Sequence, residues 1–145
     1  MAINKYRPLK TALVLLCAML LGCSTASNEP HSFEKLQADA DDLNAKAPYM
    51  SDKDTMVLKA TAKESVFEIH NMLIHFDLTN LDKDALAIYK EHIKGILTYL
   101  SCTIKELKDY PEHHTTLSWQ YYDKSKTHFL SHQVNLETCN KMPKK

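Results

Sequence analysis

Glycine and proline are scarce in this sequence. Its 145 residues include 2 glycines and 5 prolines, and Gly95 is the one glycine that follows residue 22. A β-sandwich or β-barrel needs many tight turns, which these two residue types usually provide. The scarcity therefore argues against a fold of many short strands and favours a few long helices. We predict an all-α protein.

An excess of basic residues is also missing. Lys and Arg together number 18, and Asp and Glu together number 18. Three of the basic residues lie within residues 1–22, so the remainder of the chain carries 15 basic and 18 acidic residues, a net charge of −3. Proteins that bind nucleic acids concentrate Lys and Arg on one face to contact phosphates. We therefore predict no nucleic-acid partner.

Motifs that organise a reaction are absent as well. The sequence contains no Gly-rich phosphate loop, no Gly-x-Ser-x-Gly and no Cys-x-x-Cys-His. Its carboxylates are scattered singly, apart from Asp39, Asp41 and Asp42, which are typical of a solvated helix end. The sequence thus predicts a protein that is not an enzyme and that holds no dissociable cofactor.

The sequence has no apolar run of transmembrane length at its start. A membrane-spanning helix needs about 20 apolar residues, whereas the uncharged run 11–21 has eleven. Lys5, Arg7 and Lys10 precede this run, and small residues follow it. A basic start, a short apolar centre and small residues after it are typical of an export signal.

The run ends in Leu20-Leu21-Gly22-Cys23, followed by Ser24. This resembles the lipobox of bacterial lipoproteins, in which Leu, a small or aliphatic residue and Gly or Ala precede a Cys. The resemblance implies that the Cys23 thiol is alkylated by a diacylglyceryl group, after which cleavage before Cys23 removes residues 1–22 as a signal peptide and frees an amine for a further acyl chain. Two or more acyl chains anchor a protein stably to a membrane. By the same resemblance, Ser24 predicts the periplasmic side of the outer membrane, while Cys17 leaves with the signal.

Apolar residues in the rest of the chain recur at helical spacing. We predict a lipidated tether over 23–31, a helical domain over 32–140 and a frayed tail over 141–145. Ser32 is the expected N-cap of a short first helix that ends at Pro48. Three longer helices are expected at about 51–77, 80–110 and 115–139. Such elements predict an up-down helical bundle.

Cys102 and Cys139 are the cysteines that remain once Cys23 is lipidated. An oxidising compartment favours a disulfide between them. A straight hairpin of the last two predicted helices would instead separate them by about 28 Å along the axis, far beyond the ~7 Å that a bridge allows between Cα atoms. Either the last helix bends back near residues 123–125 and the disulfide forms, or the thiols stay unpaired or join two molecules.

Two further pairs are candidates for binding. His128 and His132 have the i, i+4 spacing of metal ligands on a helix, but no Glu of a zincin motif lies between them, so we predict no metal site and regard them as weak candidates. Trp119, Tyr121 and Tyr122 cannot all face one core from a single helix. Trp119 and Tyr121 are therefore candidate contacts with a partner, the alternative being contact with the first helix.

The predicted role is that of a protein-binding adaptor or assembly factor held at a membrane by its lipid. Small helical lipoproteins that guide secretin subunits of secretion systems are similar in size and predicted architecture, which implies a pilot-like role. Two alternatives remain. One is a periplasmic metal-binding or metal-sensing protein that uses His128 and His132, with Cys139. The other is an inhibitor or immunity-type lipoprotein.

Overall fold

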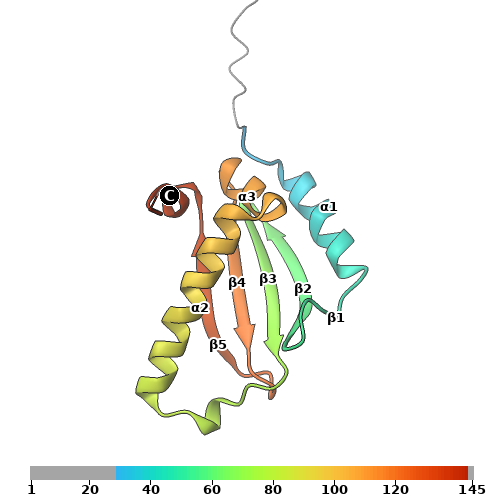
Figure 1. Ribbon diagram of the computed structural model, residues 1–145. Coiled ribbons are helices and arrows are strands. Elements are labelled where there is room, and N and C mark those ends of the chain that lie inside the picture. The colour runs from blue at the N-terminus through green and yellow to red at the C-terminus, as the bar shows by residue number, and fades with distance from the viewer. Residues whose placement is uncertain (1–28, 144–145) are drawn as a thin grey trace, which may run out of the picture.

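The computed structural model describes residues 29–143, so the predicted signal peptide and Cys23 lie outside the described residues. Figure 1 shows a sheet with helices beside it. The elements are α1 (Phe33–Asn44), β1 (Tyr49–Met50), β2 (Thr55–Lys63), β3 (Val66–Leu73), the 3-10 turn η1 (Leu78–Asn80), α2 (Lys83–Thr103), α3 (Lys105–Glu112), β4 (Thr116–Tyr122), β5 (His128–Val134) and α4 (Leu136–Asn140). The prediction of an all-α bundle is wrong.

The five strands form one sheet in the order β1-β2-β3-β4-β5. Neighbouring strands run antiparallel, except for β3 and β4, which run parallel. A parallel pair cannot be joined by a tight turn and needs a long crossover. Here η1, α2 and α3 provide it, and two antiparallel hairpins, β2-β3 and β4-β5, lie on either side of that crossover.

The second and fourth predicted helices are in fact these hairpins. In β4 the buried side chains Leu117, Trp119 and Tyr121 recur at every second residue, which is the period of a strand. In β3, Phe67 and Ile69 recur in the same way. The apolar residues of 56–74 gave a broad helical face because two adjacent buried strands place many apolar residues close together in sequence.

The hairpin turns are built without glycine. Glu64, between β2 and β3, has φ 51°, and Lys126, between β4 and β5, has φ 64°. In the second turn Asp123 Oδ1 accepts hydrogen bonds from the backbone N–H of Ser125, at 2.9 Å, and of Thr127, at 2.8 Å. Side-chain bonds of this kind stabilise a turn where glycine is missing. A low glycine content therefore did not exclude β-hairpins, which is why the all-α prediction failed.

The helices have recognisable start and stop signals. Ser32 is the N-cap of α1, as predicted, and its Oγ accepts a hydrogen bond from Lys35 N at 3.2 Å. Asp82 caps α2 in the same way through Ala85 N, at 2.8 Å. The predicted helix over 80–110 is broken at Ile104, whose backbone is extended. Within residues 29–143, no helix combines the length and the apolar character that a membrane span requires.

The long helices lie against one face of the sheet. Trp119 Nε1 on β4 donates to Ser101 Oγ on α2 at 3.0 Å, and Phe67 on β3 stacks on Tyr110 of α3 with 4.8 Å between ring centroids. The opposite face carries a hydrogen-bonded row of polar side chains that includes Glu68, His70, Ser118, Gln120 and Tyr122. The molecule is thus a two-layer α/β structure whose core lies between the sheet and its helices.

Cys102 on α2 and Cys139 on α4 form a disulfide, with 5.4 Å between their Cα atoms. The large axial offset expected for a helical hairpin does not arise. β5 runs antiparallel to β4 and returns the chain to the end of the sheet where β4 begins. α3 joins that end to the C-terminus of α2, so α4 comes to lie beside Cys102.

Candidate partner-binding groove

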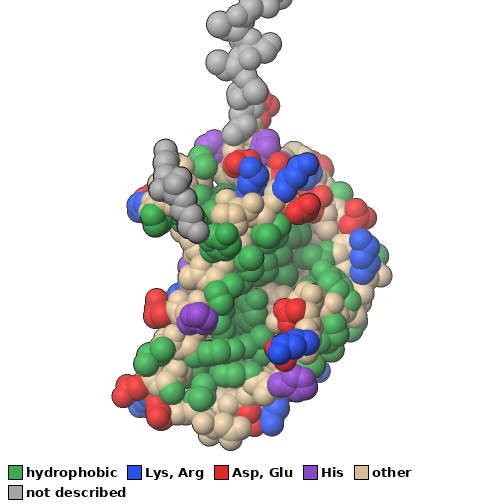
Figure 2. Space-filling view, viewed as in Figure 1, with side chains coloured by type: hydrophobic (Ala, Val, Ile, Leu, Met, Phe, Trp, Pro, Cys, Tyr) green, Lys and Arg blue, Asp and Glu red, His purple; other side chains and the backbone are tan. Residues whose placement is uncertain are grey.

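A groove opens on the helix-covered face, between α1 on one side and α2 on the other. The groove is a cavity of ≈ 350 Å³. Figure 2 shows hydrophobic side chains gathered in this hollow. Its lining residues are Leu43, Tyr49, Ser51, Asp52, Thr55, Val57, Ile69, Asn71, Leu97, Leu100, Leu107, Trp119 and Tyr121.

The floor of the groove comes from β3 and β4. Ile69 pairs with Trp119 and Asn71 pairs with Tyr121 in the parallel register. Residues paired across neighbouring strands point to the same face of a sheet, so these four side chains form one surface. Trp119 and Tyr121 are each 8% exposed. Their buried position shows that the floor belongs to the hydrophobic core as well as to the groove.

The aromatic floor is held in place and uncharged. The indole of Trp119 donates to the hydroxyl of Ser101, which is fully buried. Burial raises the pKa of Tyr121 to about 12, and the nearby carboxylate of Asp52 adds to this shift. The phenol therefore stays neutral at physiological pH. Rigid, buried aromatic side chains of this kind often carry much of the energy of a protein interface.

The rim of the groove carries one negative charge. Asp52 Oδ1 accepts hydrogen bonds from the backbone N–H of Asp54, at 2.8 Å, and of Thr55, at 2.9 Å. These bonds, with that from Asp54 first, hold the pKa of Asp52 below its usual value. None of the residues lining the groove is Lys, Arg or His. The groove is therefore an apolar surface with an acidic edge.

Sequence reasoning placed Trp119 and Tyr121 on a helix, where one of them would be exposed to a partner or packed against the first helix. The helix is wrong, because the two residues lie on strand β4, where both are buried. On a strand, Trp119 and Tyr121 point to the same face of the sheet and Tyr122 points to the other, so the three aromatics need not all fit on one side of a helix. Trp119 and Tyr121 line the groove, and their contact with a partner remains a prediction.

The weak metal candidates His128 and His132 are not brought together. They lie on β5, so helical spacing does not apply. His132 Nε2 forms a hydrogen bond with Thr98 Oγ1 of α2 at 2.8 Å, whereas His128 Nε2 bonds to Gln120 Oε1 on the polar face at 2.9 Å. Cys139 is in the disulfide. This arrangement removes the geometric basis of the metal-sensing alternative as the sequence posed it.

Most of the groove was missed from the sequence. Val57 and Ile69 are β-branched residues in strands, and a search for period-two alternation would have placed them on one face. The leucines of the groove walls could not be found in this way. The apolar character of Leu43, Leu97 and Leu107 predicts only that each side chain faces the core. No sequence signal shows that the helices carrying them stand apart and leave the sheet uncovered.

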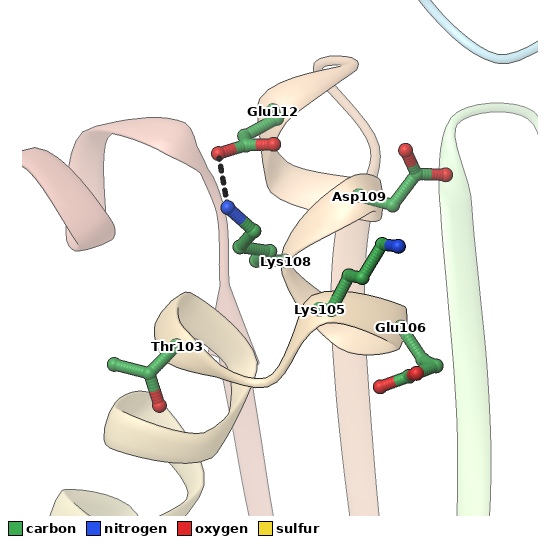
Figure 3. Close-up of a pocket in the computed structure, with 6 residues that line it drawn as sticks. All are labelled: Thr103, Lys105, Glu106, Lys108, Asp109 and Glu112. Atoms are coloured by element: carbon green, nitrogen blue, oxygen red, sulfur yellow. Dashed lines mark ion pairs between the residues drawn. The ribbon is translucent and has the colours of Figure 1, made fainter.

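A second depression lies along α3 and has a different character. Its lining residues are Thr103, Lys105, Glu106, Lys108, Asp109 and Glu112. Figure 3 shows the Lys108–Glu112 ion pair, 3.5 Å between Nζ and Oε1, on one side of the helix, while Asp109 points away from it. Surface ion pairs of this kind contribute little binding energy. We therefore take the apolar groove as the candidate site.

No protein-family model matches this sequence, and no curated protein matches it. Solved structures do match. The pilotin EpsS of the Vibrio vulnificus type 2 secretion system aligns with a TM-score of 0.60 and 12% identity, over 77% of this chain and 92% of its own. The pilotin AspS of the Vibrio cholerae type II secretion system aligns with a TM-score of 0.56 and 15% identity, over 73% of this chain and 90% of its own.

A protein of Pseudomonas aeruginosa described as secreted is similar to the same extent. It aligns with a TM-score of 0.57 and 10% identity, over 73% of this chain and 90% of its own. Identities this low establish a shared fold and leave activity open. The chain therefore has the fold of two type II secretion pilotins, at nearly their full length.

Proposed function

We propose that this protein is a pilot-type assembly factor, which captures an apolar segment of a secretin subunit in the groove between α1 and α2. The observation that carries the proposal is an aromatic-floored groove on a fold shared with two pilotins. Binding rather than catalysis is the expected activity. A fold alone does not fix function, so the groove is the part of the argument that can be tested.

The groove indicates what its occupant should look like. Helices that dock into apolar grooves present hydrophobic residues at i, i+3, i+4 and i+7. The leucines of α1, α2 and α3 form the walls and the two aromatics of β4 form the floor. Asp52 supplies the only charge among the lining residues. We therefore expect an amphipathic helix whose apolar face fills the groove and whose Lys or Arg approaches Asp52.

The proposed position of the protein follows from its first residues. Lipid on Cys23 would hold the domain at the periplasmic side of the outer membrane, with residues 23–31 as the tether. An anchored groove would meet its partner at the membrane where a pore subunit assembles. Cys23 lies outside the described residues, so this placement depends on the lipobox resemblance alone.

Site-specific photo-crosslinking in cells tests the proposal. A photoreactive amino acid at Leu100, in the groove, should crosslink to an apolar segment of a secretin, identified by mass spectrometry. The same probe at Ile88, which is 73% exposed on the outer side of α2, should not. Absence of a crosslink from position 100, or the same products from both positions, would contradict the proposal.

A matched pair of variants tests the energetics of the same contact. Leu100→Glu puts a charge into the apolar groove beside its acidic rim and should abolish capture of the partner helix. Ile96→Glu makes the same chemical change on the same helix, but at an exposed position outside the groove. It should bind normally. Equal binding by the two variants would show that the groove is not the contact surface.

A further inference from the structure

We propose that His31, Asp109 and His113 form a binding site for a zinc ion, which joins the segment entering the domain to helix α3. The site lies apart from the groove and does not depend on the proposed function. One nitrogen of each histidine and a carboxylate oxygen of Asp109 all lie within 4.8 Å of one another. The sequence pattern gave no hint of it, because His31 is distant in sequence from the other two.

The helix contributes two of the three ligands. Asp109 and His113 are four residues apart at the end of α3, so their side chains project from the same side of the helix. Figure 3 shows Asp109 pointing away from the Lys108–Glu112 pair. Its two oxygens face the two histidines, with Oδ2 at 3.2 Å from His31 Nε2 and Oδ1 at 3.3 Å from His113 Nδ1.

Each of the two nitrogen–oxygen distances is close to the spacing of neighbouring ligand atoms at tetrahedral zinc. Zinc bonds to histidine nitrogen and carboxylate oxygen are about 2.0–2.2 Å long, so neighbouring ligand atoms lie about 3.3 Å apart. Two imidazoles with one carboxylate suit zinc and related transition metals, whereas Ca²⁺ and Mg²⁺ prefer oxygen ligands. The exposed fractions of the Asp109 and His113 side chains, 47% and 31%, leave room for an ion to enter and for a fourth ligand such as water.

His31 is preorganised by its surroundings. Its side chain is 7% exposed, and its ring contacts Tyr110 edge-on with 5.6 Å between centroids. Its second ring nitrogen, Nδ1, lies 3.4 Å from the hydroxyl of Thr115, which is buried. Histidines that ligate metals usually engage their other nitrogen in this way, which fixes the ring. This contact is a second observation in favour of a ligand role for Nε2.

Two features of the site must change when the ion binds. His113 Nδ1 also bonds to the carbonyl oxygen of Asp109 at 2.9 Å, and its ring stacks on His31 at 4.6 Å between centroids. The ion would replace that hydrogen bond, and the His113 ring would rotate to point its nitrogen at the metal. Lys35 lies nearby, but its Nζ pairs with Asp39 Oδ2 at 2.7 Å. The rearrangement is therefore confined to one half-buried side chain, that of His113.

Zinc titration of the purified full chain, stripped of metal with a chelator, tests the site. We expect one zinc ion per chain, bound with a Kd below about 10 μM, and a higher Tm in the presence of zinc because the ion binds only the folded state. Asp109→Asn keeps the shape of the side chain while removing its charge, and His31→Ala removes a ligand. Each should weaken binding by at least about tenfold and abolish the shift in Tm.

His92→Ala is the control, since His92 is exposed on α2 and away from the site. It should bind zinc as the unaltered chain does. Absence of binding below about 10 μM by the unaltered chain would overturn the proposal. Binding that survives unchanged in both Asp109→Asn and His31→Ala would overturn it too. Asp109→Asn distinguishes loss of a ligand from loss of fold, because its unfolding transition without metal can be compared directly with that of the unaltered chain.

Discussion

At the scale of single residues, the hydrogen bond between Trp119 and Ser101 joins the floor of the groove to its wall. Both groups are buried, and the 3.0 Å bond is a side-chain contact between β4 and α2. Trp119→Phe keeps an aromatic ring but leaves the Ser101 hydroxyl without its donor. We expect a loss of about 2 kcal/mol in the free energy of unfolding, measured by urea denaturation.

Ser101→Ala is the matched variant for this prediction. It removes the other partner of the bond and should cost about 1 kcal/mol on its own. If the bond is the cause, the double variant loses less than the sum of the two single losses. Strict additivity of the two losses would mean that the hydrogen bond contributes nothing and that ring volume alone explains the effect of Trp119→Phe.

His132 should make stability depend on pH. Burial lowers its pKa in the folded chain, with Lys94 adding to the shift and Glu91 opposing it. Well above pH 6.5, the usual pKa of histidine, His132 is neutral in both the folded and the unfolded chain. As the pH falls below that value, the unfolded chain takes up a proton that the folded chain does not, so the free energy of unfolding decreases until the folded pKa is passed.

His132→Gln should therefore lose less stability than the unaltered chain between about pH 7.5 and pH 5. Urea denaturation at the two pH values measures the difference. The pKa values of His31 and His70 are lowered as well, first by burial, so part of the pH dependence remains. His92→Gln, at an exposed position, serves as the control and should leave the dependence unchanged. If His132→Gln and His92→Gln lost the same amount of stability between these pH values, the assignment to His132 would be refuted.

At the scale of elements, the hairpin turns show how the chain forms a sheet with almost no glycine. Lys126 has φ 64°, a conformation in which a side chain costs about 1 kcal/mol or more. Lys126→Gly removes this strain, although it adds freedom to the unfolded chain. We expect a net gain of about 0.5 kcal/mol in the free energy of unfolding.

Ser125→Gly is the control, because Ser125 is its neighbour in the same turn and is not among the residues with positive φ. There the added freedom of the unfolded chain is not offset by relief of strain, so stability should fall by about 0.5–1 kcal/mol. Urea denaturation compares the two. A loss of stability in Lys126→Gly as large as in Ser125→Gly would show that the left-handed turn carries no strain.

These turns also explain how much of the fold the sequence could predict. The N-cap at Ser32 and the apolar stripe of α2 are local signals, and α1 and α2 both lie within the longer ranges that those signals predicted. The apolar residues of the 115–139 segment fit either a helix or a strand. The low glycine content led to the prediction of a helix, which is wrong. The spacing of Trp119 and Tyr121 could have predicted the strand, because two residues at i and i+2 face the same core on a strand and opposite sides on a helix.

The candidate site was less predictable than the fold, because its parts are distant in sequence. Trp119 and Tyr121 were identified as candidate partner contacts, but on a helix, whereas both are buried on strand β4. The groove exists because α1 and α2 cover different parts of one sheet face and leave a gap between them. That spacing depends on tertiary packing, which a single sequence does not reveal.

At the scale of the whole molecule, the lipid predicted on Cys23 would decide where the groove can act. Two or more acyl chains are what would hold the domain stably at a membrane surface. Cys23→Ser should abolish incorporation of labelled palmitate and leave residues 1–22 attached, because no thiol remains to be alkylated before cleavage. Palmitate labelling and the mass of the chain from cells expressing each variant measure this.

Cys17→Ser is the matched control for that experiment, since it changes the same residue type six positions earlier in the sequence. If Cys17 leaves with the signal, this variant is labelled and anchored as the unaltered chain is. An unrelated lipoprotein signal with its own cysteine, in place of residues 1–23, should restore labelling. If Cys23→Ser is still labelled with palmitate and still loses residues 1–22, the lipobox assignment fails, and the groove must be presented to its partner by other means.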